Sequence, residues 1–462
     1  MKKRIVIGYI LAFMSGISMV NAQSKFTYVE PKDSLVRERI STWQDLKFGM
    51  FIHWGTYSMV PVMESWSICP EKREWVQKSR PENFPYIDYL KYYEGLYKAF
   101  NPVNFNPDKW AEAALDAGMK YVVFTTKHHD GFNMFDTQQS DYKVTSESCP
   151  FHNNKRANIS SEVFNAFRDK GLKAGAYFSI ADWHHNDYWW QHYPPVDRYL
   201  NYDPELYPEK FKNFVDFLDA QVEEITNGDY GDIELMWLDL CEISETYKID
   251  YPWERLASTA RKKQPGIIMV ARGTHGEYEN YYTAELKIPE KVLDYPWECC
   301  FPLGQSWAHR AIPNYKSVSR VIEMLITVVS RGGNFLLGVG PGPDGEFLPE
   351  MYDKLAQVGD WMEINGEGIY GSKPVSPYQQ DNIFYTTSNG CTYAFVILGD
   401  EGSLPRKLQL NDLEVQSSAK ISILGSKTSL RWKKMNGGIE IDIPSSLVQT
   451  PPCKYAVCLK IK

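Results

Sequence analysis

Residues 107–126 carry a helix pattern followed directly by a strand pattern: Pro107-Asp-Lys-Trp-Ala-Glu-Ala-Ala-Leu-Asp-Ala-Gly118, then Tyr121-Val-Val-Phe-Thr-Thr126. The first stretch is amphipathic at helical spacing, and the second is rich in β-branched and aromatic residues. A strand that is apolar on both faces is typical of a parallel sheet covered by helices. This pair of elements therefore favours a fold in which strands and helices alternate.

The same alternation recurs over the first 370 residues. Strands are predicted at 48–53, 121–126, 174–180, 233–239, 266–271 and 333–337, with helices at 107–118, 163–171, 208–226 and 318–329. We interpret this pattern as a (β/α)8-like TIM barrel with insertions. A doubly wound open sheet is the alternative. It is weakened because no G-x-G-x-x-G or P-loop motif follows any strand.

Near residue 370 the pattern changes to short alternating runs without long helices. These runs are 383–387, 392–397, 407–410, 420–424, 439–443 and 455–459, and Asn389-Gly390 and Asn436-Gly437 between them predict hairpin turns. We expect a small C-terminal antiparallel β-sandwich. The predicted domains are a signal peptide at 1–22, a catalytic (β/α) barrel at 23–370 and a β-sandwich at 371–462.

Composition excludes several classes of protein. The chain has 462 residues, 43% of them hydrophobic, which is ample for a large core and excludes a disordered chain. Its formal net charge of −8 does not suit a surface that neutralises phosphates, so no nucleic-acid partner is expected. Aromatic residues make up 14%. They indicate either a large hydrophobic core or flat ring faces that bind a ligand such as a sugar.

The N-terminus is typical of a secretory signal peptide. Lys2, Lys3 and Arg4 precede an apolar stretch at 5–20, and Val20-Asn21-Ala22 suits cleavage after Ala22. A membrane anchor is the alternative, but the apolar run is short for a span. We expect an exported protein, periplasmic or secreted, with no stable membrane insertion once the signal is removed.

Polar and aromatic side chains follow five of the predicted strands, at the end of a barrel where active sites lie. They are His53, Lys127-His128-His129-Asp130, Tyr177 with Asp182-Trp183-His184-His185, Asp239, and Arg272. Adjacent residues of an extended segment point to opposite sides, so one ion is not expected to bind both His128 and His129. The absence of H-E-x-x-H, C-x-x-C and G-x-S-x-G motifs argues against a metal site and a serine nucleophile. No cofactor is expected.

Paired carboxylates remain as the candidate catalytic groups, and most enzymes that cleave glycosidic bonds use such a pair. Asp239 ends the apolar run Leu235-Met-Trp-Leu-Asp239, which places its backbone rigidly. Its partner is either Glu285, in Tyr282-Thr-Ala-Glu285, or Glu298, in Pro296-Trp-Glu298.

The chain resembles the α-L-fucosidases of glycoside hydrolase family 29 from about residue 35 to 375. The matching motifs are Lys47-Phe-Gly-Met-Phe-Ile-His-Trp-Gly55, Glu74-Trp75, Thr125-Thr-Lys-His-His-Asp-Gly-Phe132, Trp237-Leu-Asp239, Thr283-Ala-Glu285, Pro296-Trp-Glu298, Ser330-Arg-Gly-Gly-Asn-Phe-Leu-Leu337 and Gly359-Asp-Trp-Met-Glu-Ile-Asn-Gly-Glu-Gly-Ile-Tyr370. The resemblance implies an exported, retaining exo-α-L-fucosidase that acts on a fucosylated glycan or oligosaccharide. Two alternatives are a catalytically silent fucose-binding protein and a glycosidase for another 6-deoxy or galacto-configured sugar.

The resemblance also implies roles for individual residues. Asp239 matches the nucleophile. Glu285 matches the acid/base of some members and Glu298 that of others, and we favour Glu285. The positions that hold fucose are matched by His53, Glu74, Trp75, His128, His129, Tyr177, Trp237 and Arg272. The chain departs from the family pattern at Leu240 and Gly273, where Gly and Trp are common, and at Gly338, where Asn is common.

Overall fold

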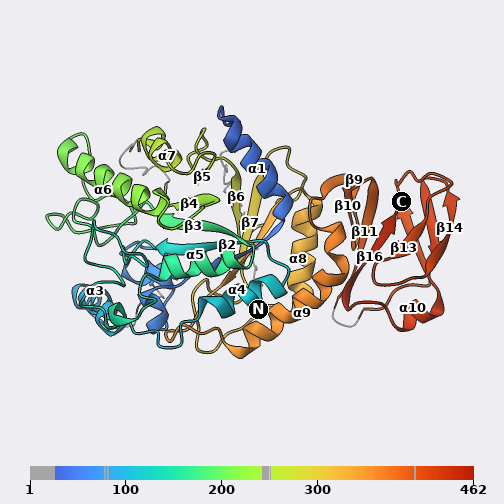
Figure 1. Ribbon diagram of the computed structural model, residues 1–462, viewed down its shortest axis with the longest axis horizontal. Coiled ribbons are helices and arrows are strands. Elements are labelled where there is room, and N and C mark those ends of the chain that lie inside the picture. The colour runs from blue at the N-terminus through green and yellow to red at the C-terminus, as the bar shows by residue number, and fades with distance from the viewer. Residues whose placement is uncertain (1–25, 78–79, 81–82, 242–248, 250, 400–401) are drawn as a thin grey trace, which may run out of the picture.

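The structure is a computed structural model that describes residues 26–77, 80, 83–241, 249, 251–399 and 402–462. The predicted signal peptide at 1–22 lies outside these residues. Figure 1 shows a larger barrel domain joined to a smaller domain at the C-terminal end of the chain, which consists mainly of β-strands and contains the short helix α10, Ser445–Gln449.

Eight parallel strands form the first domain and confirm the predicted barrel. They are β1 Phe48–Ile52, β2 Tyr121–Lys127, β3 Lys173–Ser179, β4 Leu235–Asp239, β5 Ile268–Ala271, β6 Tyr282–Glu285, β7 Trp297–Pro302 and β8 Asn334–Val339. The strand order is β5-β4-β3-β2-β1-β8-β7-β6. The barrel is nearly closed, because Glu279, just before β6, forms an antiparallel bridge with Val270 of β5.

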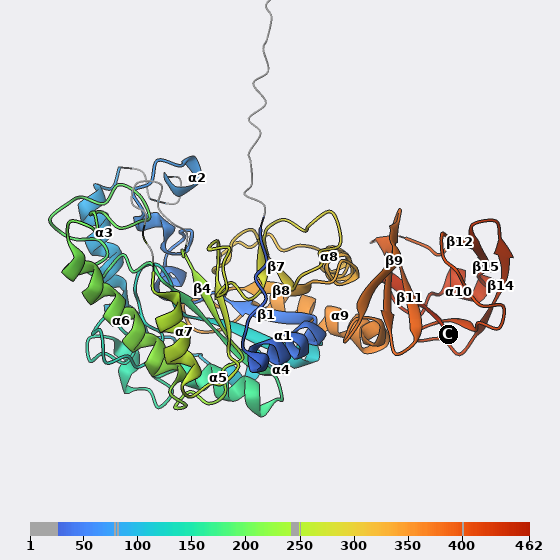
Figure 2. The same ribbon diagram turned by 90° about the horizontal axis from the view of Figure 1, so that it is seen from above.

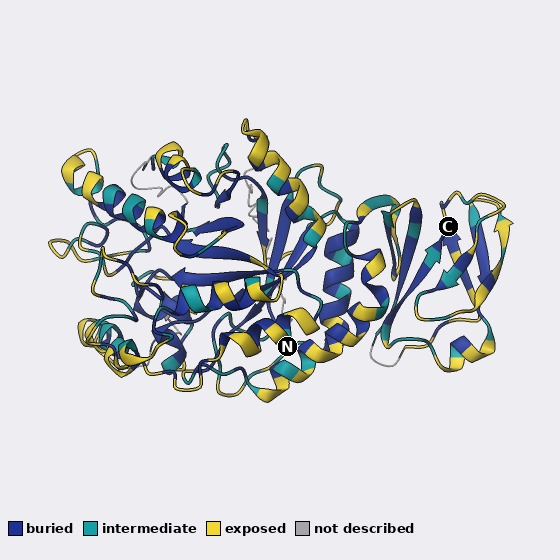
Figure 3. Ribbon diagram, in the orientation of Figure 1, coloured by how far each residue is buried: buried dark blue, intermediate teal, exposed yellow. Residues whose placement is uncertain are grey.

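Helices cover the outside of the barrel. The longer ones are α1 Ser34–Leu46, α3 Tyr86–Glu94, α4 Pro107–Asp116, α5 Ile159–Asp169, α6 Pro208–Thr226, α7 Trp253–Arg261, α8 Val318–Ser330 and α9 Pro349–Asn365. In α6, Phe214, Leu218, Val222 and Ile225 are buried at helical spacing and face the strands. Figure 3 shows the same division, with buried strands inside and exposed outer helix faces. Among the described residues, no helix is both long and apolar enough to span a bilayer.

The C-terminal domain is antiparallel, as predicted. Its strands are β9 Lys373–Gln380, β10 Ile383–Ser388, β11 Cys391–Gly399, β12 Lys407–Asn411, β13 Ile421–Ile423, β14 Ser429–Met435, β15 Gly438–Asp442 and β16 Tyr455–Ile461. The sheet order is β12-β15-β14-β13-β16-β11-β10-β9. Gln380 at the end of β9 hydrogen-bonds the backbone of Gln409 and Asn411 in β12, so the sheet folds over onto itself. Its own apolar core lies between the two halves.

The two domains pack directly against each other through α8 and α9, as Figure 2 shows. The indole of Trp361 in α9 donates a hydrogen bond to the carbonyl of Ala456 at 2.8 Å. Tyr393 donates to Glu367, just after α9, at 2.7 Å. Trp361, Phe395 and Ala456 belong to the same apolar cluster as the barrel. The barrel core therefore continues into the small domain without a linker.

Candidate active site

A pocket of about 110 Å³ opens at the carboxyl ends of the barrel strands. Strands β1 to β5 contribute to it, either directly or through the residues that follow them, and residues from β6, β7 and three connecting segments complete it. Its lining residues are Phe51, His53, Glu64, Trp66, His128, His129, Tyr177, Arg198, Trp237, Asp239, Leu240, Arg272, Glu285, Cys300 and Trp307. Eight of the ten predicted site residues, Glu285 among them, thus meet in one cavity.

His128 and His129 both line this pocket, which corrects the expectation that they point to opposite sides. Their ring centroids are only 4.1 Å apart. Strand alternation does not apply to them because β2 ends at Lys127 and the pairing of β2 with β3 shifts register at that point. The two imidazoles belong to a turn, so both reach the same side.

Hydrogen bonds fix the orientation of His129. The Ser179 hydroxyl donates to the carbonyl of Ala181 at 2.6 Å, so it accepts from Nδ1 of His129 at 2.7 Å. Nε2 of a neutral His129 then has a free lone pair, 3.8 Å from Asp239. Burial lowers the pKa of His129 well below its ordinary value, and it lowers that of His128 to about 4. Both rings are therefore neutral at neutral pH and can accept hydrogen bonds from hydroxyl groups of a ligand.

Asp239 is held as a carboxylate by three donors. Arg272 Nη1 donates to Oδ1 at 2.6 Å, the Tyr177 hydroxyl donates to Oδ2 at 2.8 Å, and the backbone of Leu240 donates to Oδ1 at 2.9 Å. Burial by itself would raise the pKa of Asp239. The Arg272 charge and the Tyr177 bond outweigh that effect and hold the pKa below its ordinary value. Asp239 is therefore ionised and oriented, as a nucleophile has to be.

Arg272 bridges the two predicted catalytic carboxylates. While Nη1 binds Asp239, Nη2 donates to Glu285 Oε2 at 2.8 Å. The guanidinium is fixed from two further sides, since Nε donates to the Thr283 hydroxyl at 2.9 Å and its carbon lies 4.5 Å from the centre of the Trp237 ring. One planar group therefore holds both carboxylates in the same part of the pocket.

Glu298, the other candidate acid, lies inside the barrel and does not line the pocket. It is 1% exposed, and three side chains donate to it: Tyr121 at 2.6 Å, Trp237 at 3.1 Å and Tyr281 at 3.2 Å. Burial raises its pKa to about 7, although these hydrogen bonds partly oppose the shift. The structure brings Glu285, and not Glu298, into the cavity with Asp239.

The buried Glu298 leads to a prediction about stability. Its folded-state pKa lies above the value of 4.5 for a solvated carboxyl, so the folded protein keeps this proton over a range where the unfolded chain loses it. Stability should therefore fall as pH rises from about 4.5 to 7, by on the order of 3 kcal/mol from this group. Glu298→Gln cannot titrate and should lack this component.

Urea unfolding of both proteins between pH 4.5 and 8 measures the effect. The difference in free energy of unfolding should shift in favour of the Gln variant up to about pH 7 and then level off. Other titrating groups cancel in this difference. A difference that stays constant with pH would contradict the raised pKa.

Glu74 and Trp75 do not line the pocket. Both are exposed on the short helix α2, Glu74–Gln77. The pocket instead receives Glu64 and Trp66, and Trp75 packs edge-on against Trp66 with ring centroids 5.0 Å apart. The fucose-holding roles predicted for Glu74 and Trp75 remain predictions that this geometry does not support.

Four charged or aromatic pocket residues that lie outside the predicted strands are not among the predicted site residues: Glu64, Trp66, Arg198 and Trp307. Glu64 is 2% exposed and accepts hydrogen bonds from Ser306 and from the backbone of Ala308, both at 2.8 Å. None of the four stands at the end of a predicted strand. The one available signal was Glu64-Ser-Trp66, a second glutamate–tryptophan pair close to Glu74-Trp75.

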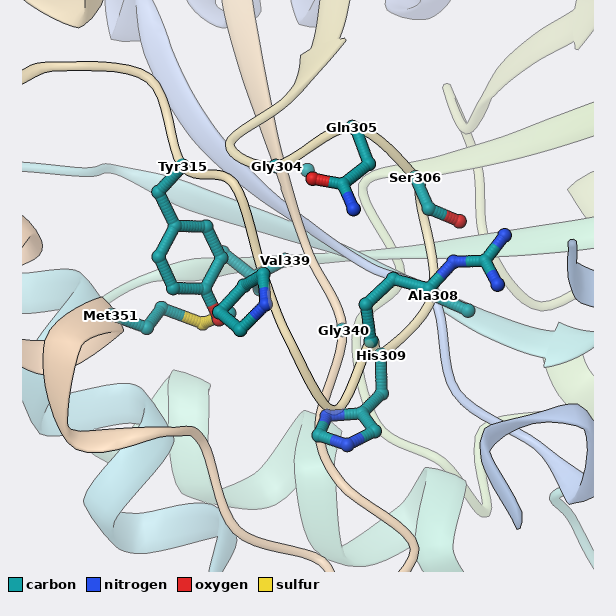
Figure 4. Close-up of a pocket in the computed structure, with 12 residues that line it drawn as sticks. Gly304, Gln305, Ser306, Ala308, His309, Tyr315, Val339, Gly340 and Met351 are labelled. Atoms are coloured by element: carbon teal, nitrogen blue, oxygen red, sulfur yellow. The ribbon is translucent and has the colours of Figure 1, made fainter. Parts of the chain in front are cut away.

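The segment after β7 forms one wall of the site. Trp307 stacks on His53, with ring centroids 5.0 Å apart. A Cβ atom at position 338 would lie 2.7 Å from the Trp307 ring, so the departure from the family pattern at Gly338 makes room for this indole. Ser306 and Ala308 line a neighbouring cavity, shown in Figure 4. At about 10 Å³ it holds about one water and is too small for a sugar.

Leu240, another departure, has a backbone φ of 52°. This is the left-handed region that favours glycine, which accounts for the glycine common there in the family. Within the described part of the chain, no group of three His, Cys, Asp or Glu side chains is placed to hold a metal ion, and no disulfide bond is formed.

A (β/α) barrel whose pocket sets two carboxylates against each other among imidazole and indole rings defines a glycoside hydrolase. The chain belongs to the α-L-fucosidase family, glycoside hydrolase family 29. It matches that family over residues 15–367 and the α-L-fucosidase C-terminal domain over residues 376–462. The resemblance inferred from the motifs is confirmed.

Relatives from distant organisms match almost end to end. The chain is 28% identical to tissue α-L-fucosidase of Mus musculus, covering 93% of both chains, and 28% identical to α-L-fucosidase of Dictyostelium discoideum, covering 98% of both. Among solved structures, α-L-fucosidase isoenzyme 1 from Paenibacillus thiaminolyticus has a TM-score of 0.76 at 29% identity, covering 93% of this chain and 99% of that one. The fold is shared with a Thermotoga maritima α-fucosidase solved in complex with fucose, with a TM-score of 0.72 at 24% identity, covering 92% and 98%.

Proposed function

We propose that the protein is an exported, retaining exo-α-L-fucosidase that removes terminal α-L-fucosyl residues from glycans by double displacement. The observation that carries this proposal is the Arg272 guanidinium that contacts both Asp239 and Glu285. Retention requires carboxyl groups about 5–5.5 Å apart, whereas inversion needs roughly 6.5–9.5 Å to admit a water. Two carboxylates bridged by one guanidinium suit the shorter separation.

In the first half of the reaction, Asp239 attacks the anomeric carbon while Glu285 gives its proton to the departing glycosidic oxygen. The bond from carbon to the leaving group breaks as the bond to Asp239 forms. In the second half, Glu285 takes a proton from water, the water oxygen attacks the same carbon, and Asp239 leaves as a carboxylate. Each carboxyl group is restored, and the two inversions give net retention.

The remaining pocket residues suit one deoxy sugar. His53, His128 and His129 offer imidazole nitrogens to hydroxyl groups, and Trp237 offers an apolar face to the C5 methyl group of fucose. We add Glu64 and Trp66 to this set in preference to Glu74 and Trp75. The small volume of the cavity supports release of one terminal residue at a time.

Proton NMR of early hydrolysis tests retention. The first product seen should be α-fucose, with the β anomer appearing later at the rate of mutarotation. Initial β-fucose would overturn the double-displacement mechanism but would leave the substrate assignment intact.

Export is proposed from residues 1–22 alone, with a mature chain that comprises a catalytic barrel at 23–370 and a β-sandwich at 371–462. Mass spectrometry of the exported protein should give Gln23 as its first residue, because Val20-Asn21-Ala22 provides the small residue at the cleavage site. A chain retained in the membrane fraction with its N-terminus intact would favour the anchor instead.

A further inference from the structure

Trp237 contacts both of the side chains that orient Asp239. Its ring stacks on Tyr177, with centroids 5.4 Å apart, and the Arg272 guanidinium lies over it at 4.5 Å. Tyr177 and Arg272 are the two side chains that donate to the Asp239 carboxylate. A rotation of the indole would therefore displace both donors.

A hydrogen bond to a buried carboxyl group holds the indole N–H. Nε1–H of Trp237 donates to Oε2 of Glu298 at 3.1 Å. Glu298 is anchored in turn, since Oε1 accepts from Tyr121 of β2 at 2.6 Å and Oε2 also accepts from Tyr281, next to β6, at 3.2 Å. One carboxyl on β7 thus joins groups from three other parts of the barrel wall.

We propose that Glu298 is a positioning residue that acts through Trp237: by accepting the indole hydrogen bond it fixes the ring against which Tyr177 and Arg272 pack, and so orients Asp239. The proposal rests on the proposed role of Asp239 as nucleophile. Glu298 does not line the pocket and is not itself a catalytic residue.

A carboxyl group suits this position because three donors converge on it. The two oxygens of a carboxyl group carry lone pairs for all three bonds. An apolar side chain of similar size would leave the Trp237 N–H and two tyrosine hydroxyls buried without an acceptor. The isosteric amide of Gln keeps one acceptor oxygen, which can serve Trp237 and Tyr281, and turns an NH₂ group toward Tyr121.

A double-mutant cycle on kcat/KM tests the proposal. Glu298→Gln should lower kcat/KM three- to tenfold, and Trp237→Phe should lower it further because it removes the indole N–H. In the Trp237→Phe background, Glu298→Gln should change kcat/KM by less than twofold, because the contact through which Glu298 acts has gone. Glu298→Met, which has no good acceptor, should cost about a hundredfold.

Two further readouts separate positioning from other roles. The loss in Glu298→Gln should fall on kcat, with KM changed less than threefold, and should be the same for dinitrophenyl fucoside and for fucosides with poor leaving groups. Losses that add in the double mutant would show that Glu298 does not act through Trp237. A loss confined to poor leaving groups would make Glu298 the acid. Because Gln is isosteric, the cycle remains decisive if the Met variant does not fold.

Failure of the proposed function gives a different result. If Asp239 is not the nucleophile, azide will not rescue its small variants, yet the cycle between Glu298 and Trp237 will still be non-additive. In that case the indole is positioned as proposed but serves another nucleophile.

Discussion

Asp239→Gly should lower turnover by several orders of magnitude while the protein stays folded. In the proposed mechanism the Asp239 carboxylate forms the covalent bond to fucose, and Gly has no group that could do so. The fold should persist because Asp239 lies at the open end of β4, where its side chain is 17% exposed, and Arg272 keeps its bonds to Glu285 and Thr283. Steady-state rates on a nitrophenyl fucoside and the melting temperature measure the two effects.

Rescue by azide distinguishes the loss of a nucleophile from other causes of low turnover. The cavity left by Gly admits azide, which should restore turnover and give a β-fucosyl azide, the anomer expected from a single displacement. Asp239→Asn is the matched control, because it fills the same space and should not be rescued. Near-normal turnover in Asp239→Gly, or an azide product of α configuration, would contradict the assignment.

Glu285→Gln should lower the rate on natural fucosides by about 10²- to 10⁴-fold, the usual contribution of a general acid. Dinitrophenol departs without a proton, so formation of the fucosyl-enzyme from dinitrophenyl fucoside should be nearly unchanged. The second step still lacks its base, so a burst followed by slow turnover is expected. Presteady-state kinetics on both kinds of substrate provide the measurement.

Two variants serve as controls for Glu285. Glu277→Gln alters a glutamate in the connection that precedes β6, one that pairs with Lys32 at the surface, and should leave all rates unchanged. Azide added to Glu285→Gln should give an α-fucosyl azide, because azide needs no base. If Glu298→Gln alone shows the dependence on leaving group, the two glutamates exchange roles.

The fold could be predicted where residue patterns are unambiguous. Helix α6 begins and ends at the predicted residues, and both Asn-Gly turns join adjacent antiparallel strands. Strands β9 and β14 were missed because their sequences do not alternate cleanly. Lys373–Gln380 contains two prolines, and Ser429–Met435 contains three cations.

Part of the site could also be predicted, because some of its residues directly follow unambiguous strand patterns. Asp239 and Arg272 stand where apolar runs stop, so barrel geometry alone brings their side chains together. Glu64 and Trp307 come from long connecting segments. Such segments lack the hydrophobic periodicity of helices and strands, so the sequence does not predict how they fold back over the pocket. His128 and His129 reach the same side of the pocket because β2 ends at Lys127. The exact end of a strand is the feature that sequence patterns predict least well.

The contact between Gly338 and Trp307 restricts the order in which this wall of the pocket can evolve. A Cβ atom at position 338 would lie 2.7 Å from the indole, so the Asn common in the family at this position requires Trp307 to shift or to be replaced. If residue 307 becomes smaller to make that room, His53 loses the ring stacked upon it. The two positions, 31 residues apart in the chain, are therefore coupled, and variants at one of them are best made together with variants at the other.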